Sequence, residues 1–81
     1  MICVDVRIIG LRRVSEKELY KICVESYNTV SDVIKIIESK LGYRFNLDEI
    51  MIVCNDKQVY VEETLPSSCE NLVIFPLALG G

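Results

Sequence analysis

The sequence predicts an α+β domain, in which a mixed sheet of four to five strands carries one long helix on one face. Three observations support this class: two alternating strand-like segments open the chain, one amphipathic helical segment follows, and two or three further strand-like segments come after it. The length of 81 residues allows one hydrophobic core, so residues 1–76 are expected to form a single domain. The composition, 51% hydrophobic and 26% charged, is that of an ordinary soluble globular protein.

The first two strands follow from side chains that alternate between apolar and polar. Every second position in residues 2–9 is apolar, and this period places those side chains on one face of a strand. The inward positions are Ile2, Val4, Val6 and Ile8. Residues 19–26 alternate in the same way, with inward positions at Tyr20, Ile22 and Val24. Because residues 10–18 are polar, the two strands are expected to form a hairpin.

Between Asn28 and Gly42 the apolar period changes from two residues to three and four. Thr29, with Asp32 three positions later, predicts a helix N-cap, and Gly42 suits the left-handed residue that follows a helix. The apolar face contains Val30, Val33, Ile34, Ile37 and Leu41. Since many of these residues are β-branched, the helix should depend on packing against the sheet for its stability.

Three further segments are expected to be strands: residues 50–54, 58–61 and 72–75. The stretch Asn55-Asp56-Lys57 has the chemistry of a turn between the first two, and Pro76 should end the last. The last segment is apolar at every position. This is typical of a strand in the middle of a sheet, with the helix on one side and some other cover on the other.

The resulting order is two strands, a helix, and then two or three strands. A right-handed crossover would place the last strand beside the first and parallel to it, which is the arrangement of a β-grasp. An unspecified two-layer α+β sandwich is the alternative for this order.

Charge and hydropathy exclude two classes of partner. The formal charge is −3 and the basic residues are scattered, which argues against nucleic acid, where phosphate neutralisation supplies most of the affinity. The longest apolar run, residues 72–79, is interrupted by Pro76 and is far shorter than the ~20 residues of a membrane helix. The first residues lack the features of a signal peptide, so we expect a cytoplasmic protein.

Missing residue types make a free-standing enzyme improbable. The chain has no histidine, no Gly-rich phosphate loop and no Cys-x-x-Cys pair, so no metal site and no bound cofactor are expected. Three of the four cysteines, Cys3, Cys23 and Cys54, lie in strand-like segments and are expected to be small buried residues or thiols on a sheet face. Cys69 lies in a polar loop and is expected to be exposed.

The chain as given ends in Gly80-Gly81, after Leu77-Ala78-Leu79. Without Cβ atoms, such an end can lie extended in a narrow channel and present an unhindered carboxylate to another protein. A frayed terminus is the alternative, because chain ends are commonly flexible.

The second half resembles the MoaD and ThiS family of sulfur carrier proteins. The resemblance is carried by residues 52–56, Leu65, residues 70–76 and Gly80-Gly81. These match a family pattern of a strand ending in a Val-Asn turn, a Leu before a Gly-Asp turn, an apolar strand leading into Pro-Pro, and a final Gly-Gly. Length and element order are most like MoaD, the small subunit of molybdopterin synthase. Two departures are Cys69-Glu70 for Gly-Asp and Pro76-Leu77 for Pro-Pro.

The resemblance implies a ubiquitin-like β-grasp with a flexible tail, residues 77–81. It implies that an E1-like adenylating enzyme of the MoeB or ThiF type uses ATP and magnesium to adenylate Gly81, which then becomes a thiocarboxylate. The sulfur would pass to the large subunit of molybdopterin synthase or to another acceptor enzyme. Leu77, Ala78, Leu79 and Gly80 would lie in the partner's channel, and Phe75 with Pro76 would contact the partner.

Two points stay open at the level of sequence. In the last strand, either Val73 and Phe75 or Leu72 and Ile74 face outward, so Phe75 is either a docking residue or a core residue. The acidic residues of the second half either steer the domain toward a basic partner or are only solvated; they are Asp56, Glu62, Glu63 and Glu70.

Other functions fit the same residues. A thiamine sulfur carrier like ThiS would need the same fold and the same activated carboxylate, and so would a ubiquitin-like modifier that is joined to a lysine. In a third alternative the domain is a non-catalytic β-grasp interaction module and its terminal glycines are incidental.

Overall fold

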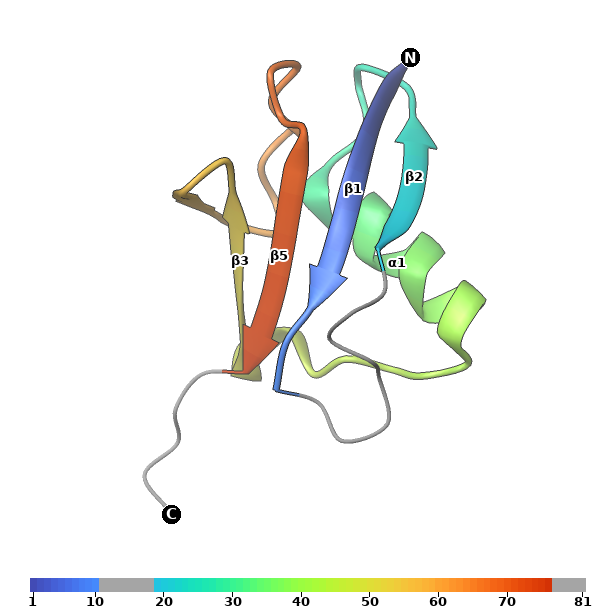
Figure 1. Ribbon diagram of the computed structural model, residues 1–81, viewed down its shortest axis with the longest axis vertical. Helices are drawn as coiled ribbons and strands as arrows, with labels where there is room; N and C mark the ends of the chain where they lie inside the picture. Colours follow the sequence, from blue (N-terminus) through green and yellow to red (C-terminus); the bar gives the residue numbers. More distant parts are fainter. Residues whose placement is uncertain (11–18, 77–81) are drawn as a thin grey trace.

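The computed structural model describes residues 1–10 and 19–76. In chain order the elements are β1 (Ile2–Ile8), β2 (Tyr20–Val24), α1 (Val30–Leu41), the 3₁₀ turn η1 (Leu47–Glu49), β3 (Ile50–Cys54), β4 (Lys57–Val59) and β5 (Asn71–Pro76). The strands form one sheet in the order β2-β1-β5-β3-β4, and α1 lies across one face of it (Figure 1). β5 is parallel to β1, as the predicted β-grasp requires, and antiparallel to β3.

The first hairpin is confirmed, with β1 and β2 antiparallel and Ile2 opposite Val24. All four predicted inward residues of β1 are buried. β2 ends at Val24, two residues earlier than predicted, because a turn follows it. In that turn the amide N–H of Glu25 donates to Oδ1 of Asn28 at 2.8 Å, and the amide N–H of Asn28 donates to the carbonyl of Glu25 at 3.0 Å.

The helix has the predicted caps. At its N-terminus the Asp32 amide donates to Oγ1 of Thr29 at 3.3 Å, and the Thr29 amide donates to Oδ2 of Asp32 at 2.9 Å. The hydrogen bond from the Thr29 backbone, with that from Asn28, lowers the pKa of the Asp32 carboxyl from its ordinary 3.8. Gly42 ends the helix with φ of 66°, in the left-handed region.

The core lies between α1 and the inner face of the sheet. Val33, Ile34 and Ile37 of the helix are buried in one cluster with the inward residues of β1 and β5. After the helix, the amide N–H of Phe45 donates to Oε2 of Glu38 at 2.8 Å, and the Phe45 ring meets the Tyr43 ring edge to face at 5.2 Å. These contacts direct the chain back toward η1 and β3.

The β3–β4 hairpin has a two-residue turn at Asn55 and Asp56. Both residues have positive φ, 47° and 73°, which is the backbone that joins two antiparallel strands most tightly. This confirms the predicted turn. β4 ends at Val59 rather than at residue 61, because the chain then turns toward the start of the helix, where the Ser31 amide donates to the Val61 carbonyl.

The cysteines form two disulfides, which corrects the expectation of separate residues. Cys3 and Cys23 lie directly opposite each other on β1 and β2, on the exposed face of the sheet. Cys54, at the end of β3, bonds to Cys69 in the loop before β5. Cys69 was expected to be exposed and is only 2% exposed. Spacings of 20 and 15 residues carry no local signal of pairing, since the partners meet only once the strands are aligned.

Candidate functional site

The alternation of β5 decides which of its side chains face outward. Leu72 and Ile74 are fully buried against the helix side of the sheet. Val73 and Phe75 therefore lie on the opposite face, where both are half-buried. No helix or strand of residues 1–10 and 19–76 covers that face (Figure 1), so the other cover expected from the sequence is not found there.

The neighbouring strands extend this outward surface. Phe75 lies opposite Met51, and Val73 lies opposite Val53 on one side and Arg7 on the other. Met51 and Val53 are half-buried like the two β5 residues. The four side chains Met51, Val53, Val73 and Phe75 form an apolar patch across β3 and β5, which we call the open-face strip.

Polar residues border the strip on both sides. Toward β1 and β2 the same face carries Arg7, the paired Asp5 and Lys21, and the Cys3–Cys23 disulfide. Toward β4 it carries Gln58, which lies opposite Val53. A small apolar centre with a polar border is the usual anatomy of a protein contact surface.

The Asn55 side chain holds the start of β5 in place next to the β3–β4 turn. Its Oδ1 accepts from the amides of Glu70 and Asn71, both at 3.1 Å, and its Nδ2 donates to the carbonyl of Ser68 at 2.7 Å. The Asn55 amide also donates to the Asn71 carbonyl at 3.0 Å. The Cys54–Cys69 disulfide joins the same two segments, so the turn and the start of β5 are tied together twice.

The predicted site residues are only partly within the described chain. Phe75 lies on the open face, as a docking residue requires, and Pro76 is the last residue of β5, opposite Ile50. Leu77, Ala78, Leu79, Gly80 and Gly81 lie outside the described residues. Pro76, the residue before them, lies at the end of the sheet where η1 leads into β3.

Acidic residues of the second half lie near both ends of β5, which the sequence alone did not show. Asp56 and Glu70 are exposed at the start of β5, at the end of the strand opposite to the tail. Asp48 and Glu49 of η1 directly precede β3, whose first residue pairs with the end of β5. Sequence reasoning missed them, because their proximity depends on the antiparallel pairing of β3 with β5.

Met51, Val53 and Arg7 are site residues that sequence reasoning also missed. The sequence contains a partial signal, since Met51 and Val53 alternate within a strand whose other positions, Ile52 and Cys54, are buried. What it lacks is the place of β3 beside β5 in the strand order and the register that sets Arg7 opposite Val73.

Comparison with known proteins adds information on the fold. No family model matches the chain, and no curated protein matches it in sequence. Among solved structures, a chain from "Molecular Mimicry of SUMO promotes DNA repair" is 16% identical with a TM-score of 0.67, covering 90% of this chain and 88% of that one. A chain from "Crystal structure of ATBAG1 in complex with HSP70" is 14% identical with a TM-score of 0.66; the match covers 98% of this chain and 42% of that one.

The strand order, the parallel β1–β5 pair and the similarity to the chain from the study of SUMO mimicry together show a ubiquitin-like β-grasp fold. No helix in residues 1–10 and 19–76 is long and apolar enough to span a membrane. Within the same residues, no group of three His, Cys, Asp or Glu side chains is placed to hold a metal ion.

Proposed function

We propose that the protein is a sulfur carrier whose Gly81 carboxylate is activated by an E1-like enzyme and converted to a thiocarboxylate for cofactor biosynthesis, with molybdopterin as the favoured product. The observation that carries the proposal is a ubiquitin-like β-grasp in which β5 leads directly into a segment that contains Gly80-Gly81. The open-face strip supports it, because an apolar patch on the strand that leads to the tail suits docking on a large partner.

The proposed chemistry needs no side chain of this domain. The carboxylate oxygen of Gly81 attacks the α-phosphate of magnesium-bound ATP, which forms an acyl adenylate and releases pyrophosphate. A sulfur nucleophile, hydrosulfide or an enzyme persulfide, then attacks the carbonyl carbon; the new C–S bond replaces the C–O bond to AMP, and AMP leaves. With a persulfide donor, a thiol must then cleave the S–S bond to release the thiocarboxylate. The domain's part is to present the tail, while ATP and magnesium are bound by the activating enzyme.

The acceptor follows from the same scheme. A molybdopterin synthase large subunit would take the tail into its active site and pass the sulfur to a pterin precursor. A thiazole synthase would do the same for thiamine. The cytoplasm is the proposed location, because the activating step consumes ATP.

A non-catalytic interaction domain is the second candidate. It is favoured by the two structural neighbours, one described as a mimic of SUMO and the other solved in complex with HSP70. In that case the open-face strip is the functional surface and Gly81 has no chemical role.

The deciding experiment measures the intact mass of the protein after incubation with a co-encoded E1-like enzyme, ATP, magnesium and a sulfide donor. The expected product is heavier by the difference between sulfur and oxygen. A variant lacking Gly81 is the matched control and should keep its mass and its folding. The enzyme must be shown to be active by forming an adenylate on another carrier. If the wild-type mass then does not change, the carrier proposal is rejected. Covalent adducts with other proteins would instead identify a modifier.

A further inference from the structure

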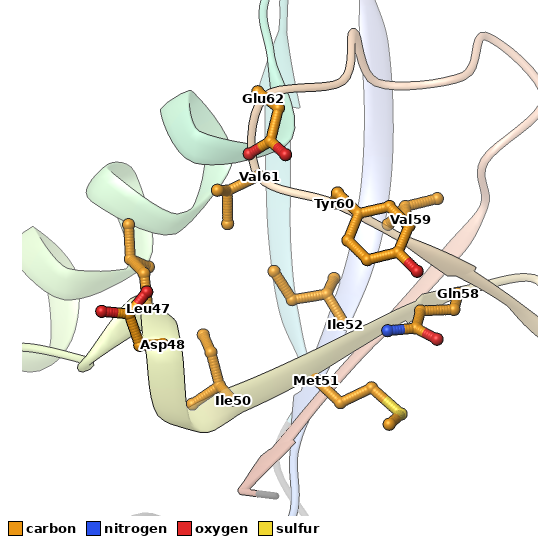
Figure 2. A pocket seen from close by; sticks show the side chains of 10 residues that line it. All are labelled: Leu47, Asp48, Ile50, Met51, Ile52, Gln58, Val59, Tyr60, Val61 and Glu62. Atoms are coloured by element: carbon orange, nitrogen blue, oxygen red, sulfur yellow. The ribbon is translucent and has the colours of Figure 1, made fainter.

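A hollow of about 280 Å³ lies at the β4 edge of the sheet, where η1 enters β3 and where the chain leaves β4. Its walls include the side chains of Ile50, Ile52 and Val61 (Figure 2). In Figure 2 the Tyr60 ring and the Asp48 carboxylate stand on opposite sides of these apolar groups, and the Glu62 carboxylate stands above them, next to Val61. The hollow thus has an apolar interior and an acidic rim.

Two large apolar side chains at this hollow are exposed. Leu47 is 39% exposed and Tyr60 is 53% exposed, and neither belongs to the buried core cluster. A partner that covered these two side chains would gain free energy by removing their apolar surface from water. Exposed apolar groups that gather around a concave surface are typical of a contact site.

The charge around the hollow indicates the chemistry of its partner. The charged residues that line the hollow, Asp48 and Glu62, are both acidic. In the described part of the chain, Asp48 and Glu62 have no cationic partner. A negative rim attracts cations and repels phosphates, so it favours a basic peptide and disfavours nucleic acid.

We propose that this hollow docks a partner peptide in which a short aliphatic centre is flanked by lysine or arginine. The aliphatic side chains enter between Ile50 and Val61 and pack against the Tyr60 ring. The flanking cations lie against the carboxylates of Asp48 and Glu62. The site acts without Gly81 and without the activating enzyme, so it holds or fails independently of the sulfur-carrier proposal.

The test titrates the full ¹⁵N-labelled chain with a seven-residue peptide, Leu-Val-Leu between two lysines on each side, and follows the amide chemical shifts. The expected shifts are confined to residues 47–52 and 58–62. Two control peptides, one with glutamates in place of the lysines and one with serines in place of the aliphatic residues, should each bind at least about tenfold more weakly.

Protein variants separate the two parts of the site. Tyr60→Ala should weaken binding about tenfold, as expected for an aromatic anchor. The pair Asp48→Asn and Glu62→Gln should weaken it about threefold to tenfold and should remove most of its salt dependence. The control is the double variant Glu25→Gln with Glu70→Gln, which removes the same two negative charges at exposed positions outside the hollow. It should leave binding unchanged.

Several results would overturn the proposal. Shifts centred on the open-face strip, equal binding of the glutamate peptide, or no shifts at millimolar peptide would each do so. Concentration-dependent shifts at the hollow without peptide would assign it to a second copy of the chain. Shifts at the hollow on removal of residues 77–81 would assign it to the protein's own tail.

Discussion

At the scale of single residues, adjacent positions of β5 have opposite roles. Ile74 is fully buried against the helix, while Phe75, the next residue, lies half-buried on the open face opposite Met51. Asn55 also has two roles. Its backbone, with positive φ, forms the β3–β4 turn, and its side chain accepts hydrogen bonds from the amides at the start of β5. A residue's type alone therefore does not reveal whether it stabilises the fold or contacts a partner.

Replacing Ile74 and Phe75 separately by alanine tests this division of roles. Ile74→Ala should lower the free energy of unfolding by about 2–5 kcal/mol, the usual effect of truncating a buried aliphatic side chain. Phe75→Ala should lower it clearly less, because part of the Phe75 side chain already meets water, while weakening binding to an activating enzyme. Urea unfolding and a binding titration measure the two effects. A Phe75→Ala loss as large as that of Ile74→Ala would make Phe75 a core residue.

At the scale of elements, local hydrogen bonds set the ends of the helix and of the hairpins. The Thr29–Asp32 capping box begins α1 and Gly42 ends it, while positive φ at Asn55 and Asp56 closes the β3–β4 turn. These devices span two to four residues, so the sequence displays them. β4 is shorter than its sequence pattern because the residues after it are drawn to the start of the helix, which is a contact between distant segments.

Asp32 should make the stability of the protein depend on pH in the acid range. Its pKa is lower in the folded chain than its ordinary 3.8, so the unfolded chain binds more protons there and stability decreases as the pH falls through the folded pKa. Asp32→Asn should be less stable than the wild type above this range, and the difference should shrink on acidification. Unfolding measured from pH 7 to pH 2 checks this. Glu70→Gln is the control, and the same pH dependence in both variants would contradict it.

At the scale of the whole molecule, the two disulfides join segments that the sheet has already brought together. One closes the β1–β2 hairpin at the edge of the sheet, and the other ties the loop before β5 to the end of β3. Their loops do not overlap along the chain. Such bonds persist in oxidising compartments and are rare in most cytosols, so the redox state of the purified protein bears directly on the cytoplasmic proposal.

Loop closure predicts the effect of each disulfide on unfolding. For loops of 20 and 15 residues, each bond should stabilise the folded chain by about 3 kcal/mol, a large fraction of the stability of so small a domain. Cys3→Ser with Cys23→Ser, and Cys54→Ala with Cys69→Ala, should each lower the unfolding free energy by that amount under non-reducing conditions. Unfolding midpoints that do not change would show that the bond concerned is absent in solution.

A dithiol reductant should distinguish the two bonds by their exposure. Cys3 and Cys23 are exposed on the sheet face, while Cys54 and Cys69 are both buried. Alkylation of the folded protein during reduction, followed by peptide mass analysis, should therefore label Cys3 and Cys23 first. Equal labelling rates for all four cysteines would indicate that the molecule opens globally before either bond is reduced.

By itself the sequence determined the main strands and the helix, which residues of β1 and α1 face inward, and where the helix caps lie, and it favoured a last strand parallel to the first. These features rest on periods of two and 3.6 residues, on hydrogen bonds between near neighbours, and on the handedness of crossovers. Only the tertiary structure decided which face of β5 is open, how the cysteines pair, and where the acidic hollow lies. Each of these depends on the register between strands distant in the chain, which no local pattern encodes.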